Sequence, residues 1–118
     1  MIIEISDENY VQIVEGLDKP LFIDFYSPMC GPCQEVLQLL PHLDNYFKER
    51  AIIAKVNVTQ NPKLAQKYEI SSVPFCVSID AMKKEVKDYE LGGGSADRYI
   101  RMIEKAEGKK GFFSRLFS

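Results

Sequence analysis

The sequence predicts an α/β fold in which a mixed β-sheet is covered by helices on both faces. Apolar runs typical of strands alternate with stretches whose apolar residues recur every three or four positions, which is typical of helices. The last two strand-like runs follow each other without a helix between them and predict a hairpin. The length of 118 residues fits one domain with a single sizeable core. Alternating strands and helices that end in a hairpin imply a sheet with parallel and antiparallel pairs.

The first part of the chain predicts a strand, a helix and a second strand. Residues 2–5 are rich in isoleucine, and Ser6 fits the N-cap of a helix whose apolar residues keep helical spacing up to Leu17. Residues 21–26 are apolar on both faces except for Asp24. We therefore expect residues 21–26 to form a central strand with helices on either side.

The middle of the chain predicts two helices around a third strand. A helix with an apolar stripe should follow the central strand and reach about Arg50, and Pro41 should kink it. Residues 51–58 predict a second buried strand. Asn61 and Pro62 then supply a cap and a first-turn proline for a short helix.

The last part of the chain predicts a hairpin and a final helix. The strands span residues 75–79 and 86–91, and the turn between them lacks glycine, which leaves its geometry open. Three glycines at 92–94 interrupt the chain before Ser95 caps the last helix. The expected fold is thus α/β, with a central mixed β-sheet of about five strands flanked by four helices.

Cys30 and Cys33 lie where the central strand gives way to the long helix. Partial positive charge and free amide donors at a helix N-terminus favour a thiolate, which is the nucleophile in disulfide exchange. With two residues between the cysteines, the second sulfur can attack a mixed disulfide formed by the first. Pro32 suits the first helical turn. The arrangement predicts a redox site.

Two other interpretations of the cysteine pair stay open, a pair of core cysteines and half of a zinc site. A zinc site usually needs four Cys or His ligands, and the chain offers only Cys76 and His42 besides the pair. We expect His42 to lie at the surface or in helix packing. Cys76 is expected to pack within its strand, and the alternative is a third redox thiol, which needs solvent access. No metal or organic cofactor is expected.

The composition predicts a soluble globular protein with an uneven charge distribution. All seventeen acidic residues and twelve of the fifteen basic residues lie in residues 1–107, whereas residues 108–118 hold three basic residues and no acid. The acidic body argues against a nucleic-acid surface. No run is apolar enough to span a membrane and the N-terminus lacks a signal-peptide pattern, so we expect a cytoplasmic protein, in which three cysteines are not a disulfide scaffold.

Across residues 1–107 the sequence resembles thioredoxin. The resemblance rests on the motif Cys30-Gly31-Pro32-Cys33 and on segments that keep the family's spacing up to Pro74. It implies a thioredoxin fold and disulfide exchange with protein substrates. The other matching segments are Phe22-Ile23-Asp24-Phe25-Tyr26, Ala54-Lys55-Val56-Asn57-Val58 followed by Asn61-Pro62, and Tyr68-Glu69-Ile70-Ser71-Ser72-Val73-Pro74-Phe75.

The resemblance implies roles for four residues around the motif. Cys30 would be the exposed attacking thiol and Cys33 the more buried resolving thiol. Asp24 would lie beneath them, where burial should raise its pKa and let it exchange protons with Cys33. Lys55 would be the buried partner of Asp24. A purely structural Asp24–Lys55 pair, or a Lys55 side chain that snorkels to the surface, stays open.

Pro74 occupies the position of the family's cis-proline, which faces the cysteine pair. A cis bond there would leave the Val73 backbone free to pair with an extended substrate segment, although an ordinary turn or strand start at these residues stays open. An apolar rim around the cysteines would bind partner proteins. The resemblance places this rim at Met29, Gly31, Pro32, Val73, Leu91 and Gly92.

The chain departs from the family at several positions near the cysteines. Met29 stands where the family usually has tryptophan, and a flexible methionine should accept different partners. Gln34 replaces a usual basic residue, which should stabilise the thiolates slightly less. The helix proline comes three residues late, at Pro41, and a longer hairpin turn weakens the assignments of Leu91 and Gly92.

Residues 108–118 predict a basic, amphipathic C-terminal tail beyond a thioredoxin-like domain of residues 1–107. Wound as a helix, the tail would place bulky apolar side chains opposite basic ones. This pattern is typical of helices that lie in an anionic membrane surface, and it resembles the short membrane-targeting tails of bacterial septum-site ATPases. Packing on the domain and a dimer contact stay open. The apolar residues are Phe112, Phe113, Leu116 and Phe117.

These observations predict a thiol–disulfide oxidoreductase that reduces protein disulfides and is recycled by a separate reductase. We expect a cytoplasmic monomer, with peripheral membrane contact through the tail as a further expectation. The alternative is a thioredoxin-shaped adaptor that the tail tethers to a membrane or larger assembly. An oxidase or isomerase is less favoured, because Gly31-Pro32 is the reductase-like pair within the superfamily.

Overall fold

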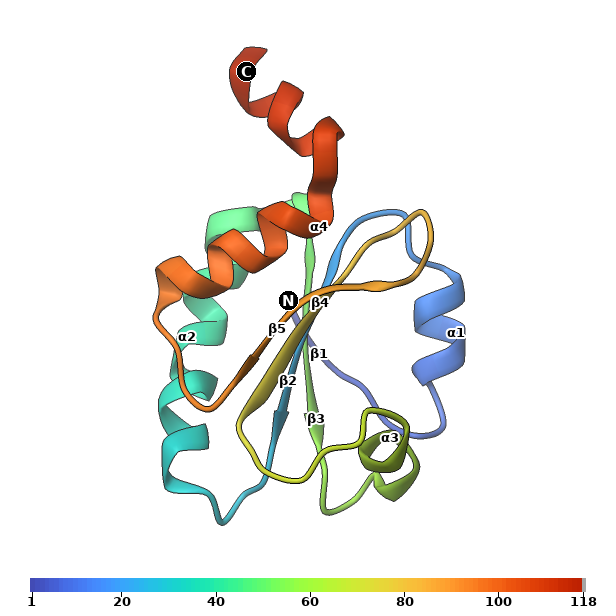
Figure 1. The fold of residues 1–118 in the computed structure, drawn as a ribbon, viewed down its shortest axis with the longest axis vertical. Coiled ribbons are helices and arrows are strands. Elements are labelled where there is room, and N and C mark those ends of the chain that lie inside the picture. The colour runs from blue at the N-terminus through green and yellow to red at the C-terminus, as the bar shows by residue number, and fades with distance from the viewer. Residues whose placement is uncertain (118) are drawn as a thin grey trace.

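In the computed structural model a five-stranded sheet separates two pairs of helices (Figure 1). The backbone is described for residues 1–117 and the side chains for residues 1–108. The elements in chain order are β1 (Ile2–Glu4), α1 (Tyr10–Glu15), β2 (Leu21–Tyr26), α2 (Gly31–Phe47), the 3-10 helix η1 (Lys48–Arg50), β3 (Ile52–Asn57), α3 (Pro62–Lys67), β4 (Phe75–Ile79), β5 (Val86–Leu91) and α4 (Ala96–Phe117).

The strand order β1-β3-β2-β4-β5 places β2 at the centre of the sheet. Strands β1, β3 and β2 run parallel, whereas β4 pairs antiparallel with β2 and with β5. This confirms the predicted mixed sheet. Asp24, in the middle of β2, pairs in register with Lys55 of β3 on one side and with Cys76 of β4 on the other.

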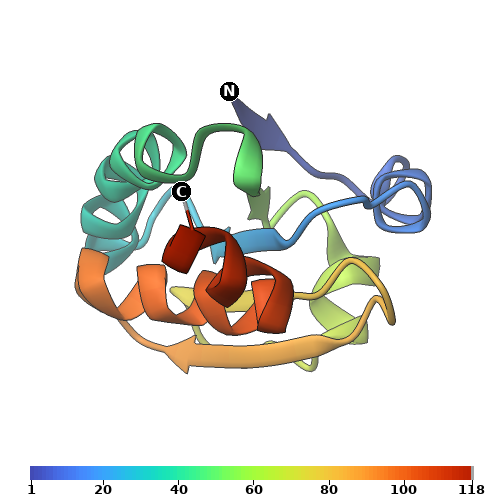
Figure 2. The ribbon, with the colours of Figure 1, turned by 90° about the horizontal axis from the view of Figure 1, so that it is seen from above.

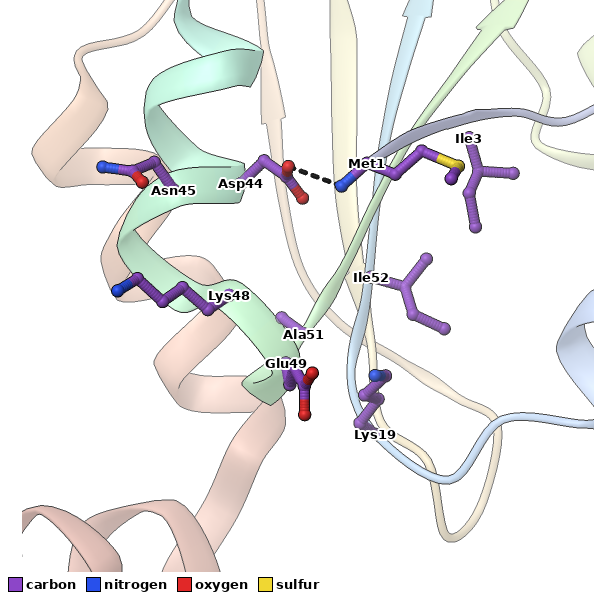
Figure 3. A pocket seen from close by; sticks show the side chains of 9 residues that line it. All are labelled: Met1, Ile3, Lys19, Asp44, Asn45, Lys48, Glu49, Ala51 and Ile52. Atoms are coloured by element: carbon purple, nitrogen blue, oxygen red, sulfur yellow. Dashed lines mark hydrogen bonds and ion pairs between the residues drawn. The ribbon is translucent and has the colours of Figure 1, made fainter.

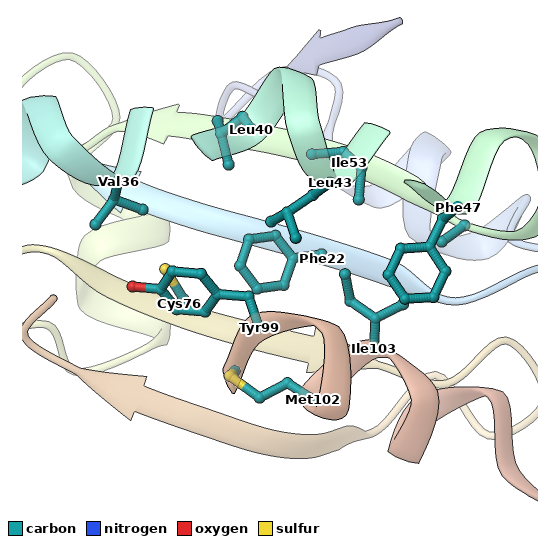
Figure 4. Packing of buried hydrophobic residues seen from close by; sticks show 11 residues of the cluster. Phe22, Val36, Leu40, Leu43, Phe47, Ile53, Cys76, Tyr99, Met102 and Ile103 are labelled. Atoms are coloured by element: carbon teal, nitrogen blue, oxygen red, sulfur yellow. The ribbon is translucent and has the colours of Figure 1, made fainter. Parts of the chain in front are cut away.

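Each face of the sheet has its own core, because successive residues of a strand point to opposite faces. Phe22 and Cys76 pack with α2 and α4 on one face, where Figure 4 shows Tyr99 and Ile103 among them. Ile23 and its odd-numbered neighbours on β2 pack with residues of α1 and α3 on the other face. Figure 2 shows the two helix pairs on opposite sides of the sheet.

The hairpin strands β4 and β5 have the predicted bounds, and the structure shows how their turn closes without glycine. The two carboxylate oxygens of Asp80 accept the backbone N–H groups of Lys83 and Glu85, each at 2.9 Å. Lys84 takes a positive φ of 59°. Its ammonium donates to the carbonyl oxygens of Leu17 and Ala81 at 2.9 and 2.6 Å. Side-chain hydrogen bonds thus stabilise this turn, whereas shorter turns rely on the conformational freedom of glycine.

The predicted N-cap at Ser6 is wrong, because the first helix begins later, at Tyr10, with Asn9 as its N-cap. Ser6 and Asn9 instead hydrogen-bond each other across the turn that precedes this helix. Ser6 Oγ accepts the Asn9 N–H at 3.3 Å, and Asn9 Oδ1 accepts the Ser6 N–H at 2.8 Å. The pair resembles a capping box, but it belongs to a turn rather than to a helix.

Asn61 occupies the N-cap position of α3, as predicted, but its side chain does not cap the helix. The free amides of Lys63 and Leu64 donate to the carboxylate of Asp7, at 3.2 and 2.9 Å. The Asn61 side chain accepts the N–H of Asp7 and donates to the Asn57 carbonyl, both at 2.8 Å. The cap therefore comes from a residue far away in the sequence, which local spacing could not reveal.

Helix α4 begins as predicted, with Ser95 Oγ accepting the Arg98 N–H at 3.1 Å. A positive φ of 66° at Gly108 breaks the helical path, and the backbone then continues as a helix to Phe117. Figure 1 shows this last segment leaving the body at the end opposite the β2–α2 junction.

None of the described helices is both long enough and apolar enough to cross a bilayer. The side chains of the predicted tail residues Phe112, Phe113, Leu116 and Phe117 lie outside those that the structure describes.

Candidate functional site

Cys30 and Cys33 form a disulfide at the junction between β2 and α2. Cys30 is the N-cap of α2, and its sulfur accepts the backbone N–H of Cys33 at 3.2 Å. Pro32 lies in the first turn, where its missing N–H leaves no helical bond unmade. Cys30 is half-buried and Cys33 is fully buried. Of the two sulfurs, the one at the N-cap is therefore the accessible one.

Asp24 is a fully buried carboxylate in the central strand. Its Oδ1 accepts a hydrogen bond from the Cys76 thiol at 3.6 Å, whereas Oδ2 has no partner among the described residues. Burial raises the pKa of Asp24 from 3.8 to about 7, and the Cys76 hydrogen bond and the charge of Lys55 oppose that rise. A carboxyl with this pKa can hold or release a proton near neutral pH.

The predicted buried Asp24–Lys55 pair is not formed. Lys55 lies beside Asp24 in register, but its side chain is 35% exposed and its ammonium lies 3.9 Å from a carboxylate oxygen of Glu4. The ammonium also lies 5.8 Å from the centroid of the Tyr26 ring. The position explains the difference, because only the short edge strand β1 lies beyond β3 and a lysine there can reach solvent. Lys55 acts on Asp24 through its charge alone.

The peptide bond between Val73 and Pro74 is cis, as the resemblance implied. The carbonyl oxygen of Val73 lies 3.7 Å from Cys30 Sγ. The Pro74 carbonyl accepts the N–H of Gly92 at 2.8 Å, which ties the start of the glycine segment to this loop. Two loops that are far apart in the sequence thus meet beside the disulfide.

The predicted apolar rim is partly accessible. Met29 is 94% exposed and Leu91 is 57% exposed, and Leu91 pairs in register with Phe75, the residue after Pro74. Gly31 and Pro32 are exposed, whereas Val73 and Gly92 are half-buried. The register between β4 and β5 places Leu91 near Pro74 despite the longer hairpin turn.

Sequence reasoning missed the surroundings of Cys76. The structure shows that the Tyr99 ring of α4 packs over Cys76 (Figure 4). The missing signal was the register of β2 and β4, which puts Asp24 opposite Cys76. His42 is exposed on α2, and the described residues contain no group of three or more potential metal ligands.

A surface hollow of about 400 Å³ lies away from the disulfide, at the other end of α2 (Figure 3). A helix of seventeen residues spans about 25 Å. The charges that line the hollow are mixed: the lining includes Lys19, Lys48 and Glu49, and the N-terminal ammonium is paired with Asp44 at 2.6 Å. Nothing in this lining selects a ligand of one charge.

A family model described as Thioredoxin matches residues 1–105. The chain belongs to the thioredoxin family. A thioredoxin from Chlorobaculum thiosulfatiphilum is 35% identical over 102 residues, which are 86% of this chain and 93% of that protein. Thioredoxin 2 of Chlorobaculum tepidum is 35% identical over 80 residues, which are 68% of this chain and 73% of that protein.

The fold is that of the thioredoxin family. It superposes on the crystal structure of chloroplastic thioredoxin z with a TM-score of 0.81 at 24% identity, covering 90% of this chain and 94% of that one. Family membership and the Cys30–Cys33 disulfide together identify the chemistry as thiol–disulfide exchange. Thioredoxins generally act on protein disulfides and are returned to the dithiol state by a reductase.

The raised pKa of Asp24 makes stability depend on pH. In the unfolded chain this carboxyl ionises near pH 3.8, and in the folded protein near pH 7. Between these values the folded state keeps a proton that the unfolded state has lost. The free energy of unfolding therefore falls as the pH rises from about 4 to about 7, by on the order of 4 kcal/mol, and levels off above that range.

Asp24→Asn removes this ionisation. The variant should be more stable than wild type by a few kcal/mol at pH 8, and the difference should be much smaller at pH 4. Urea unfolding of the oxidised protein at both pH values measures it. The control is Asp18→Asn, because Asp18 is exposed and its replacement should give the same small change at both pH values. An Asp24→Asn effect of equal size at pH 4 and pH 8 contradicts the burial argument.

Proposed function

We propose that this chain is a protein disulfide reductase in which Cys30 attacks and Cys33 resolves. The observation that carries the proposal is the placement of Cys30 Sγ. It accepts the Cys33 N–H at the start of α2 and lies beside the Val73 carbonyl, next to an accessible apolar rim. The helix amide and dipole stabilise negative charge on the more accessible sulfur, which is what a nucleophilic thiolate needs.

In the first step the Cys30 thiolate attacks one sulfur of a substrate disulfide. The substrate S–S bond breaks, a mixed disulfide with Cys30 forms, and the leaving sulfur takes a proton from solvent. In the second step Cys33 gives its proton to Asp24, and the Cys33 thiolate attacks Cys30 Sγ. The Cys30–Cys33 bond forms and the second substrate sulfur leaves, so the electron pair of the dithiol has passed to the substrate.

Asp24 would take the proton in the second step. Cys33 is fully buried on α2, the helix that covers the face of the sheet from which Asp24 projects. A buried thiol can lose its proton readily only to an internal acceptor, and a carboxyl that titrates near 7 is such an acceptor at cellular pH. The half-exposed Lys55 favours the ionised carboxylate from the neighbouring strand.

The substrate would dock as an extended segment against Val73 and the rim. A strand-like segment can form main-chain hydrogen bonds there, while Met29 and Leu91 contact its apolar side chains. Backbone contacts carry little sequence information, so we expect a range of protein partners. A separate reductase would then return two electrons to the disulfide.

Single cysteine substitutions test the reductase. In dithiol-driven reduction of a model protein disulfide, Cys30→Ser should fall to the uncatalysed rate, because the attacking sulfur is gone. Cys33→Ser should instead accumulate a covalent complex with the substrate, visible by non-reducing electrophoresis, because the mixed disulfide cannot be resolved. Gln38→Ala, an exposed change on the same helix, is the control and should keep wild-type activity. An inactive wild type contradicts the proposal.

A second candidate function is a tethered role, in which residues 108–118 hold the domain at an anionic membrane surface. Two observations favour it: the segment contains three basic residues and no acid, and its backbone continues as a helix after the break at Gly108. The segment leaves the body at the end opposite the β2–α2 junction (Figure 1). An anchored domain would therefore still present its cysteines to partners, and a tether does not exclude the reductase.

Vesicle binding tests the tether. The full chain should cosediment with vesicles that contain anionic phospholipid, and a chain ending at Glu107 should not, because short basic amphipathic helices bind through charge and apolar burial. Binding of the full chain should weaken in high salt and on neutral vesicles. Equal sedimentation of the two chains contradicts the tether and leaves the reductase proposal unaffected.

A further inference from the structure

A row of polar side chains crosses the whole sheet on the face that α2 and α4 cover. The register of the four strand pairs aligns one residue from every strand, and cross-strand partners project to the same face. The ends of the row are charged and partly exposed, and its centre is fully buried. From β1 to β5 the row is Glu4, Lys55, Asp24, Cys76 and Glu90.

The two outer carboxylates of the row have cationic partners. Glu4 lies 3.9 Å from the Lys55 ammonium, and Glu90 accepts from Arg98 of α4 at 2.7 Å. Asp24 has no ion pair among the described residues. Among the described side chains its carboxylate accepts a hydrogen bond from the Cys76 thiol, at 3.6 Å. The carboxylates at the edges of the sheet are thus paired with cations, whereas the carboxylate at its centre is hydrogen-bonded to a thiol.

Tyr99 packs against Cys76 on the face that α4 covers. Its ring comes from α4, is fully buried, packs against Phe22 at a centroid distance of 5.4 Å, and lies over Cys76 (Figure 4). The end of the ring is held from outside by the glycine segment, because a Cβ on Gly94 would lie 3.1 Å from the Tyr99 hydroxyl oxygen. Cys76 is thus enclosed between an aromatic ring and a carboxylate and has no route to solvent.

We propose that Cys76 is a positioning residue for Asp24. Its thiol donates to Oδ1, leaves Oδ2 as the oxygen that takes the proton of Cys33, and lowers the pH at which that transfer operates. The inference deepens the proposed reductase and rests on it for the identity of the proton donor. The hydrogen bond itself does not depend on which substrate the dithiol reduces.

The direction of the effect follows from the charge that each contact favours. A donor to a carboxylate stabilises the ionised form, whereas burial disfavours it. The Cys76 thiol lowers the pKa of Asp24 against the larger effect of burial. Removing the thiol hydrogen should therefore raise the pKa of Asp24 above about 7. Tyr99 of α4 loses its contact with the thiol in the variant. The other titratable groups that face this part of the sheet stay the same: Glu4 of β1, Lys55 of β3, Tyr26 of β2, Cys33 of α2 and Glu90 of β5.

Two substitutions that differ by one hydroxyl group test the role of Cys76. In Cys76→Ala the donor is absent, and in Cys76→Ser a stronger donor replaces it. The measurement is the carboxyl carbon titration of Asp24 by NMR in the oxidised full chain, where Cys30 and Cys33 are bonded and do not titrate. We expect the midpoint to rise by about half a pH unit or more in Cys76→Ala, and to stay at or below the wild-type value in Cys76→Ser.

A midpoint that rises equally in both variants, or in neither, overturns the proposal. If Cys76→Ala does not fold, Cys76→Val fills the space without a donor and takes its place against Cys76→Ser. If neither Cys76→Ala nor Cys76→Val folds, Cys76→Ser is compared with wild type alone. An Asp24 midpoint above that of wild type then overturns the proposal, and a midpoint at or below it supports the proposal.

The second readout is the pH profile of disulfide reduction by the same variants. Its acid limb should move in the same direction as the Asp24 midpoint, with a larger effect near pH 7 than at pH 9, where the carboxyl is ionised in every variant. A uniform loss of rate at all pH values indicates a merely structural role and overturns the proposal. The two proposals fail differently, because an inactive wild type removes the reductase while the NMR titration still reports the Cys76 hydrogen bond.

Discussion

The structure depends on one junction, where the central strand ends and the long helix begins. Cys30 is the N-cap of that helix, and its sulfur accepts the helical N–H of Cys33 at 3.2 Å. A side chain at this position faces unpaired amides, and here the acceptor is sulfur rather than oxygen. The same contact therefore caps the helix and favours negative charge on the sulfur. One hydrogen bond thus both caps α2 and prepares the Cys30 sulfur for reaction.

The second constraint is a buried carboxylate, because its charged form loses the favourable interaction with water when it is buried. Asp24 is flanked on its own face by a half-exposed lysine and a buried thiol, and one of its oxygens has no partner among the described residues. Such a group weakens the folded state once it ionises. A carboxylate in the middle of the central strand is consistent with use as a proton acceptor, because stability alone favours an uncharged side chain.

The sequence was sufficient where the determinants of structure are local. The bounds of β2 and β4 follow from apolar runs, and the redox pair follows from two cysteines at a strand-to-helix junction. Prediction failed where a distant residue decides. Asp7 supplies the hydrogen bonds to α3 that Asn61 was expected to make, and Lys55 reaches solvent because its strand lies next to a short edge strand. The contact between Asp24 and Cys76 needs the strand register, which no local pattern contains.

The central claim is that Cys30 and Cys33 exchange an electron pair reversibly. Equilibration of the full chain in buffers of graded glutathione redox ratio, followed by thiol alkylation and mass analysis, tests it most directly. We expect one reversible two-electron transition confined to Cys30 and Cys33, with buried Cys76 a thiol throughout. A pair that stays oxidised or reduced across the whole range, or a disulfide that includes Cys76, contradicts it.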